Sequence, residues 1–495
     1  MKLTYDVNAR LGKDLSVKQN LIFALQQMIA IMAATLLVPI LITSYGLEAD
    51  PAAALFGAGV GTIVYILCTQ RKSPVFLGSS FTFLGAYATT VGMNYGYWGI
   101  ILGVLFAGLV YVLIALIIKL VGSKWVNKLM PAVIIGPIVA LIGLSLSGTA
   151  TDWVMGNGQA TYYTSTVSEI VYSTDYNWIA VICGLFTFFA IVFVSVKGSK
   201  NLKLIPFVIG VGAGYALALV FTLIGKIAGS QYLQVLSFDS FKEAFSPFGV
   251  TSIVDYPKFF FLKAIQEKGF AKIDGAMIGN LLLIYVPIAV VELAQHISDH
   301  KNLGNIIGKD LITDPGLDKT LLGDGLGSIA GSFFGGCANT TYGESIGCVA
   351  ITGNASIVTI FFAALGCIIL SFFTPFVAII NSIPKCVMGG ACIALYGFIA
   401  VSGLQMLKNV DLGDNKNLFV VSAILVTGIG GMYFGFGFSP VQEGAPLLNI
   451  TSLAVALIVG ILTNLLTHSG KDKVKDDDVM SKATDTMKDA FKEGE

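Results

Sequence analysis

The chain has 495 residues, of which 55% are hydrophobic and only 12% are charged, and its mean hydropathy is +0.80. Soluble domains carry about 25% charged residues, so this composition indicates a polytopic membrane protein. The formal net charge is zero and no basic stripe is interleaved with aromatic residues, which argues against a nucleic-acid or polyanion partner.

Hydropathy and helix-breaking residues predict an all-α protein with fourteen membrane-spanning segments in two sets of seven. The first set lies near residues 20–44, 51–69, 73–91, 97–121, 130–147, 177–197 and 204–226. The second set lies near residues 275–297, 320–335, 344–353, 354–376, 384–405, 416–432 and 448–467. Between the sets, residues 228–273 are mixed in character and suit either an amphipathic segment at the membrane interface or an ordinary loop.

Positive residues gather in alternate connections between these segments, which predicts the side of the membrane on which each connection lies. They are Lys2, Arg10, Lys13, Lys18, Arg71, Lys72, Lys124, Lys128, Lys197, Lys200, Lys203, Lys301, Lys309, Lys319, Lys408 and Lys416. We expect a multi-pass protein with both termini in the cytoplasm and a charged cytoplasmic tail over residues 469–495. An odd number of segments separates the two halves, which gives them the opposite orientations of an inverted repeat.

Two glycine-rich breaks interrupt apolar runs, one in the third segment of each set. In the second set, residues 335–347 place Glu344 in irregular sequence at bilayer depth, and residues 74–81 form the matching break in the first set. Unpaired peptide groups are costly in hydrocarbon, so such backbone is expected only where it lines a protein-enclosed cavity. We expect short β-strands there, in segments 3 and 10, followed by half-helices that offer N–H donors to a polar, planar ligand. The alternative is two unrelated packing kinks.

Cysteine and histidine residues give no sign of a metal or cofactor site. The seven cysteines lie within or beside apolar segments without the paired spacing of zinc sites, and free buried thiols are expected. His296 and His300 are spaced i, i+4, but two histidines form an incomplete ligand set. We interpret them as polar caps near the end of a segment, beside Lys301. No cofactor is expected.

These residues resemble the nucleobase–ascorbate transporter family (nucleobase:cation symporter 2), and within it the bacterial uracil permeases. The resemblance rests on Leu25-Gln26, Ala33-Ala34-Thr35, Leu77-Gly78-Ser79-Ser80-Phe81, Asp310, Asp314-Pro315-Gly316-Leu317, Asn339-Thr340-Thr341-Tyr342-Gly343-Glu344, Gly347, Thr352, Met388-Gly389-Gly390 and Leu395-Tyr396-Gly397. It covers nearly the whole chain except the tails and two long outer loops. It implies a transporter of the bacterial inner (plasma) membrane rather than an enzyme.

The resemblance also implies two inverted seven-segment repeats that build a core domain and a gate domain. Residues 1–147 would hold core segments 1–4 and gate segment 5, and residues 148–273 would hold gate segments 6 and 7 with outer loops. Residues 274–376 would form core segments 8–11, residues 377–468 gate segments 12–14, and residues 469–495 the tail. The expected partners are a nucleobase substrate, membrane lipids and a second copy of the chain joined through the gate domains.

The resemblance implies a substrate site between core and gate. Its residues would be Glu344 and Gln295, Tyr342, the backbone of Ala34, Phe81 and Gly343, and Tyr396 on the gate side. Uracil offers two N–H donors and two carbonyl acceptors, so a carboxylate at position 344 can accept while backbone amides donate. Purine-transporting relatives usually carry an amide there, so Glu344 favours uracil. The alternative role of Glu344 is to cap its half-helix, and both roles are compatible.

The segment near residues 275–297 departs from the uracil-permease pattern. Gln295 stands where the pattern has glutamate, and Asp299 stands where it has histidine. An amide can bind uracil but cannot carry a proton, so Glu292, three residues earlier, becomes a candidate proton carrier together with Glu344 and Asp299. Glu292 can instead pair with a polar group of the core. Gln27 also replaces a histidine of the pattern and can keep one hydrogen bond that orients the first segment.

We therefore expect import of a nucleobase, with uracil first, by proton symport with alternating access. Asp299 resembles purine-type relatives, which keeps a xanthine or purine permease open, and Gln295 keeps an uncoupled facilitator open. An anion exchanger or channel of the same fold is the alternative from a different class. A membrane enzyme is disfavoured because the sequence contains no nucleophile–base pair, metal-ligand set or phosphate loop at a cavity-lining position.

Overall fold

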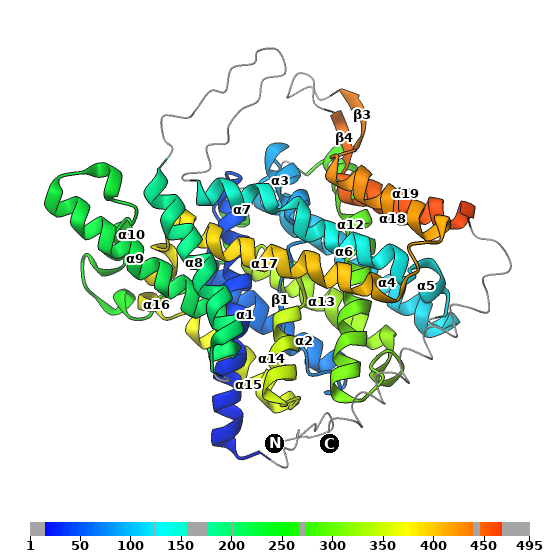
Figure 1. Cartoon of the computed structure of the whole chain (residues 1–495), viewed down its shortest axis with the longest axis horizontal. Helices are drawn as coiled ribbons and strands as arrows, with labels where there is room; N and C mark the ends of the chain where they lie inside the picture. The colour runs from blue at the N-terminus through cyan, green and yellow to red at the C-terminus, as the bar shows by residue number, and fades with distance from the viewer. Residues whose placement is uncertain are drawn as a thin grey trace.

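The computed structural model describes residues 15–122, 124–155, 177–199, 202–267, 273–438 and 446–467. The helices of the first half are α1 (Val17–Ser44), α2 (Pro51–Cys68), α3 (Leu84–Gly92), α4 (Gly96–Val121), α5 (Lys124–Leu129), α6 (Ala132–Ser145), α7 (Ser147–Val154), α8 (Trp178–Lys197), α9 (Pro206–Ala228), α10 (Asp239–Phe245) and α11 (Phe260–Gln266) (Figure 1). Those of the second half are α12 (Gly275–Ile307), α13 (Leu317–Gly335), α14 (Gly343–Thr352), α15 (Ile357–Leu370), α16 (Thr374–Asn381), α17 (Lys385–Met406), α18 (Asn415–Ile429) and α19 (Ser452–Thr467).

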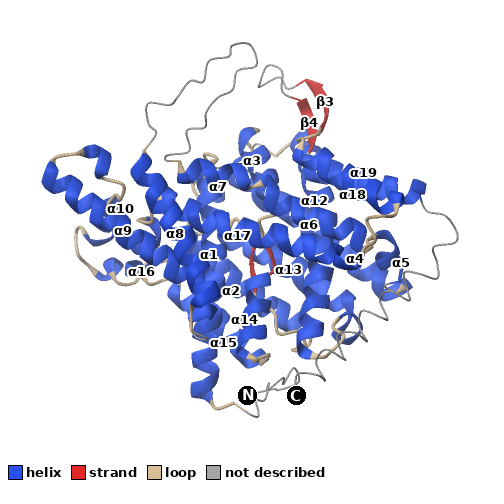
Figure 2. Cartoon of the chain, viewed as in Figure 1, coloured by secondary structure: helices blue, strands red, loops and turns tan. Residues whose placement is uncertain are grey.

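Four short strands accompany the helices in the described part of the chain. They are β1 (Leu77–Ser79), β2 (Asn339–Thr341), β3 (Phe434–Phe438) and β4 (Pro446–Ile450), paired as β1–β2 and β3–β4. Figure 2 shows the first pair inside the helical body and the second at its edge. The sequence predicts the inner pair at the two breaks but gives no hint of the outer hairpin.

Eight helices in the described residues are long and apolar enough to cross a membrane. They begin at Val17, Pro51, Gly96, Ala132, Trp178, Pro206, Gly275 and Lys385, and the one from Ala132 runs through α6 and α7 to Val154. The shorter helices α15, α18 and α19 are also apolar. This content establishes a mostly helical, multi-pass membrane protein. The predicted total of fourteen crossings stays a prediction.

Helix α12 extends ten residues beyond its predicted end, because the segment expected to end near residue 297 continues to Ile307 (307 − 297 = 10). The polar residues that end the apolar run do not break the helix. It begins after Asp274, whose side chain accepts from the Met277 backbone N–H at 2.7 Å, and it ends at Gly308, with φ +68°. Hydropathy located the apolar part of this helix and missed its polar extension.

The helices pack in two groups. In one group α13 lies against α2 and α4, α15 against α1 and α2, and α12 against α4. In the other, α17 packs on α6, α7 and α8, α8 packs on α9, and α18 lies against α6 and α19. These groups contain the helices expected for the core and gate domains. The domain boundaries themselves stay a prediction, which this packing supports.

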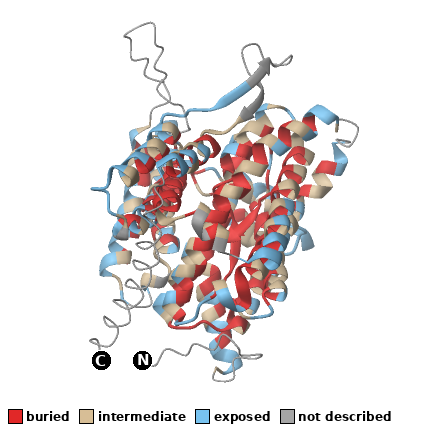
Figure 3. Ribbon diagram, turned by 90° about the vertical axis from the view of Figure 1, so that its right-hand side faces the viewer, coloured by how far each residue is buried: buried red, intermediate tan, exposed pale blue. Residues whose placement is uncertain are grey.

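Part of the connection between the two halves folds back onto the first group. In α11, Phe260 is buried and its ring centroid lies 4.7 Å from that of Tyr97 in α4. Lys263 of the same helix pairs with Glu48 at 2.8 Å. This part is therefore a packed helix rather than an open loop, and its position at the membrane interface stays a prediction. Figure 3 shows that buried residues concentrate in the middle of the molecule. The predicted tail, residues 469–495, lies outside the described residues.

Candidate substrate-binding site

The two predicted breaks meet as an antiparallel strand pair. Gly78 of β1 lies opposite Thr340 of β2. The Tyr342 hydroxyl donates to the Ser79 carbonyl oxygen at 2.7 Å. A Cβ at Gly78 would lie 2.3 Å from the Tyr342 ring, so only glycine lets the ring cross the strand here. The strands of the two breaks thereby bond to each other inside the protein, as irregular backbone at bilayer depth requires.

A half-helix follows each strand and begins beside the crossing point. Phe81 lies in the turn before α3, and Gly343 and Glu344 form the first turn of α14. The first N–H groups of an α-helix have no partner within the helix and carry partial positive charge. Glu344 is partly exposed at this end, where its carboxylate is favoured electrostatically. The crossing point therefore brings the N-terminal ends of two half-helices together with an acidic acceptor.

The polar face of α12 is held against both breaks. The Ser80 hydroxyl donates to Glu292 Oε2 at 3.1 Å, and Thr82 Oγ1 lies 3.5 Å from Gln295 Oε1. From the second break, the Thr341 hydroxyl donates to Asp299 Oδ2 at 2.7 Å. Glu292 is 1% exposed, so its pairing with Ser80 agrees with the interpretation that it contacts a polar group of the core. Gln295 and Asp299 are less buried than Glu292.

Tyr396 brings the second helix group to the site. It lies on α17, is 2% exposed, and its ring centroid is 5.7 Å from that of Phe81 in an edge-to-face arrangement. Its hydroxyl has no hydrogen-bond partner in the described part of the chain. The contact joins the first break to the predicted gate side.

Helix α1 is tied to the same region. The Gln27 side chain donates to the Ser345 hydroxyl oxygen, which also accepts from the Phe76 backbone N–H at 3.1 Å. Ala34 is buried further along α1, a helix that packs against β1 and α14. Gln27 thus holds α1 to the second half-helix, the orienting role expected for this position. The sequence-predicted residues come from five neighbouring elements, and their contact with substrate stays a prediction.

The two histidines are core residues, and their interpretation as caps at a helix end is wrong. Both lie inside α12 and are fully buried. His296 pairs with Asp324 of α13, and His300 Nε2 lies 2.6 Å from the Tyr65 hydroxyl oxygen. Asp324 is a residue for which the sequence predicts no role. A lone carboxyl among the glycines of an apolar segment was the available signal. No cluster of three or more metal-ligand residues occurs in the described ranges.

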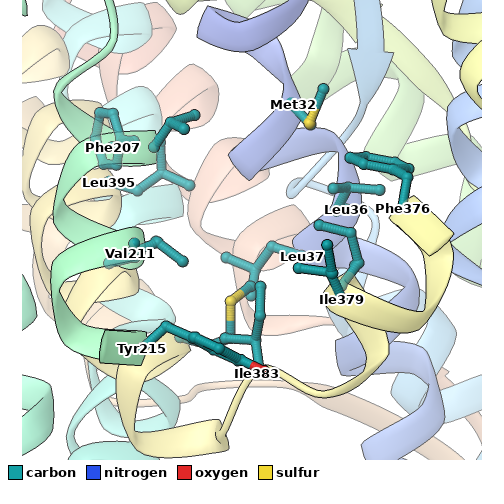
Figure 4. Close-up of a pocket in the computed structure, with 15 residues that line it drawn as sticks. Met32, Leu36, Leu37, Phe207, Val211, Tyr215, Phe376, Ile379, Ile383 and Leu395 are labelled. Carbon is teal, nitrogen blue, oxygen red and sulfur yellow. The ribbon is translucent and has the colours of Figure 1, made fainter. Parts of the chain in front are cut away.

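A separate apolar cavity of about 270 Å³ lies between α1, α9, α16 and α17 (Figure 4). Its lining includes Met32 and Leu36 of α1, Phe207 and Val211 of α9, and Leu395 of α17. A nucleobase needs polar groups to fix its orientation, and this lining offers almost none. The cavity is therefore a space between the two helix groups rather than the substrate site.

A helical membrane protein in which two interrupted segments meet inside the fold has the architecture of a secondary transporter. The xanthine and uracil permease model, described as "Permease family", matches residues 18–435. The chain belongs to this family, and the resemblance to nucleobase–ascorbate transporters is confirmed.

The chain is similar to curated members of the family over most of its length. It is 36% identical to the uracil permease of Bacillus caldolyticus over 457 residues, which are 91% of this chain and 92% of that protein. It is 34% identical to the uracil permease of Bacillus subtilis (strain 168), over 92% of this chain and 94% of that protein.

The solved transmembrane domain of the cyanobacterial bicarbonate transporter BicA has the same fold. Its TM-score is 0.55 at 14% identity, over 90% of this chain and 98% of that one. At this identity the likeness concerns the fold alone.

Proposed function

We propose that the protein is a secondary active transporter that imports uracil by proton symport. The observation that carries the proposal is Glu344, which lies in the first turn of α14 where the two breaks cross. Relatives at 36% and 34% identity that are named uracil permeases support the choice of substrate. The proposed location is the bacterial plasma membrane, with both termini in the cytoplasm.

The chemistry of uracil fits this arrangement. The Glu344 carboxylate accepts from one or both ring N–H groups, while backbone N–H groups at the starts of the half-helices donate to the ring carbonyls. Gln295 adds an amide that both donates and accepts. Phe81 of the first break and Tyr396 of the gate side place aromatic rings where the two groups meet, and a flat heterocycle can stack there.

Two helix groups with an apolar cavity between them suit alternating access. In the proposed mechanism fourteen segments form two inverted repeats, and the core group carries the base past a gate group that is fixed through a homodimer. The cavity lies between α1 of one group and α9 and α17 of the other. Apolar surfaces can slide without breaking hydrogen bonds, and a neutral site crosses apolar surroundings at lower cost than a charged one.

Proton coupling must work without an ionisable group at position 295. Glu292 lies one turn from Gln295 and receives a hydrogen bond from Ser80 of the first break. A carboxyl group so placed can take a proton and remove the charge that opposes movement through the membrane.

Asp299 favours a second candidate, a xanthine or purine permease. It is held by Thr341 of the second break and thus lies near the same base-binding region. An anion carrier of the same fold is opposed by Glu344, because a carboxylate at the crossing would repel an anion.

Uptake of labelled uracil into proteoliposomes tests the proposal. Accumulation should rise with an inward proton gradient and should be inhibited by unlabelled uracil more strongly than by xanthine. Uptake indifferent to the gradient would establish a facilitator, stronger inhibition by xanthine a purine permease, and currents carried by sulfate or chloride an anion pathway.

A further inference from the structure

Three fully buried polar side chains form a hydrogen-bonded unit behind the candidate site. His296 Nδ1 lies 2.7 Å from Asp324 Oδ2, and His296 Nε2 lies 3.0 Å from Thr320 Oγ1. The Thr320 hydroxyl is also 3.2 Å from the Leu317 carbonyl oxygen, to which it can donate. All three side chains are 0% exposed, on α12 and α13 at the centre of the first helix group.

The hydrogen atoms of this unit can be counted. A hydroxyl group has one hydrogen and a neutral imidazole has one N–H. When Thr320 donates to the Leu317 carbonyl, its oxygen accepts from His296 Nε2–H. A neutral ring then has no hydrogen on Nδ1, so the 2.7 Å contact with Asp324 needs a proton between the two groups. In this arrangement the pair carries that proton and has no net charge.

Rotation of one hydroxyl gives a second complete arrangement. If Thr320 donates to His296 Nε2 instead, the ring carries its hydrogen on Nδ1 and donates it to the Asp324 carboxylate. The pair then holds one proton fewer and has a net charge of −1. Because no heavy atom has to move, the same packing accommodates both the protonated and the deprotonated pair.

The surroundings of the pair make the free energy of its burial depend on the bound proton. Asp324 Oδ1 and Glu292 Oε1 are buried and have no hydrogen-bond partner among the described residues. Burying a carboxylate whose oxygen has no hydrogen-bond partner costs free energy. Protonation removes the negative charge and so stabilises the conformation in which Asp324 is buried. The other titratable groups that face the pair are Glu292, Asp299 and His300 of α12, Tyr111 of α4 and Tyr65 of α2.

We propose that the His296–Asp324 pair, with Thr320 as its hydroxyl switch, is the proton-binding site that couples transport. This inference rests on the proposed uracil–proton symport and assigns the coupling proton to this pair in place of Glu292, the candidate named above. His296 follows Gln295 directly, and Glu292 lies one turn away on the face toward Ser80 and the crossing strands. One proton binds to the pair from the outer side with uracil, and the same proton leaves to the cytoplasm after uracil is released.

The Asp324→Asn variant tests the assignment, because asparagine keeps the size and removes the titratable oxygen. Uracil uptake into proteoliposomes is measured with an imposed proton gradient, and uracil counterflow is measured without one. The gradient should stimulate the wild-type protein at least tenfold and the variant less than twofold, whereas counterflow should persist in the variant. Asp318→Asn, the same change on the first turn of α13, serves as the matched control and should respond as the wild type.

Gradient stimulation of Asp324→Asn equal to that of the wild type would overturn the assignment. Absence of gradient stimulation in the wild-type protein would overturn the proposed symport itself, and no variant is needed to see it. If Asp324→Asn fails to fold, Thr320→Val and Thr320→Ser give the answer. The Thr320→Ser variant should keep the stimulation by the proton gradient. The Thr320→Val variant should reduce that stimulation at least tenfold while its uracil affinity stays within threefold of the wild type. Equal stimulation in the two variants would overturn the role of the hydroxyl.

Discussion

The two breaks share a backbone plan and differ in chemistry. Each has a three-residue strand followed by a short helix, and the strands pair in register. The first break contributes the hydroxyl of Ser80 and the ring of Phe81, which hold α12 and face α17. The second contributes the Glu344 carboxylate. The fold thus repeats the strand-and-helix geometry in both halves, while the acidic group of the proposed site comes from the second half alone.

Removing the polar side chain of each break tests this difference most strongly. Glu344→Ala should lower uracil affinity by about 100-fold or more, because two hydrogen bonds to a charged group contribute about 1.5–3 kcal/mol each. Ser80→Ala, the matched change in the first break, should lower it less than about fivefold, because it removes one bond to Glu292. Calorimetric titration of the purified variants measures both. Unchanged affinity in Glu344→Ala would remove the basis of the site.

Alanine at one glycine of each break tests whether the two backbones are equally constrained. A Cβ at Gly78 would lie 2.3 Å from the Tyr342 ring, whereas a Cβ at Gly343 has no atom within 4 Å. Gly78→Ala should therefore destabilise the protein by about 1–3 kcal/mol through overpacking, and Gly343→Ala should leave stability unchanged. Thermal unfolding in detergent compares them, and equal losses would show that the crossing is not tightly packed.

The contribution of the ring contact between Phe81 and Tyr396 to uracil affinity can be measured separately from that of the tyrosine hydroxyl. Edge-to-face aromatic pairs contribute about 0.5–1.5 kcal/mol, so Phe81→Ala and Tyr396→Ala should share a coupling energy of that order in a double-mutant cycle on uracil affinity. Tyr396→Phe should bind like the wild type, since its hydroxyl has no hydrogen-bond partner in the described chain. Additive effects of the two alanine changes would mean that the rings act independently.

The smallest expected effect concerns an ion pair at the surface, outside both breaks. The hydrogen bond from Lys263 lowers the pKa of Glu48, and the charges of Lys263 and Lys258 add to this. A lowered folded-state pKa gives a stabilisation that is present above the ordinary value of about 4.3 and is lost as pH falls through the folded-state value. Glu48→Gln should slightly flatten the acid decline of the unfolding temperature below about pH 4.5, and an unchanged decline would show that the pair contributes nothing.

Much of the helical layout follows from hydropathy, because bilayer depth selects apolar runs of fixed length. The breaks were predictable as well, since glycine and a carboxyl at that depth conflict with lipid. The extension of α12 beyond residue 297 was not predictable in this way, because hydropathy does not report tertiary contacts such as that of buried His300 with Tyr65, and the exposed Asn302 and Asn305 end the apolar run without ending the helix. For the same reason the partnership of His296 with Asp324 is invisible in one sequence, where only tertiary packing joins residues 28 positions apart.

A map of the protein with uracil bound tests the central claim most directly. We expect the base at the crossing of β1 and β2, with a ring nitrogen within hydrogen-bond distance of the Glu344 carboxylate and its flat face near Phe81. Density for uracil in the apolar cavity between α1 and α9, with Glu344 facing away from it, would contradict the account.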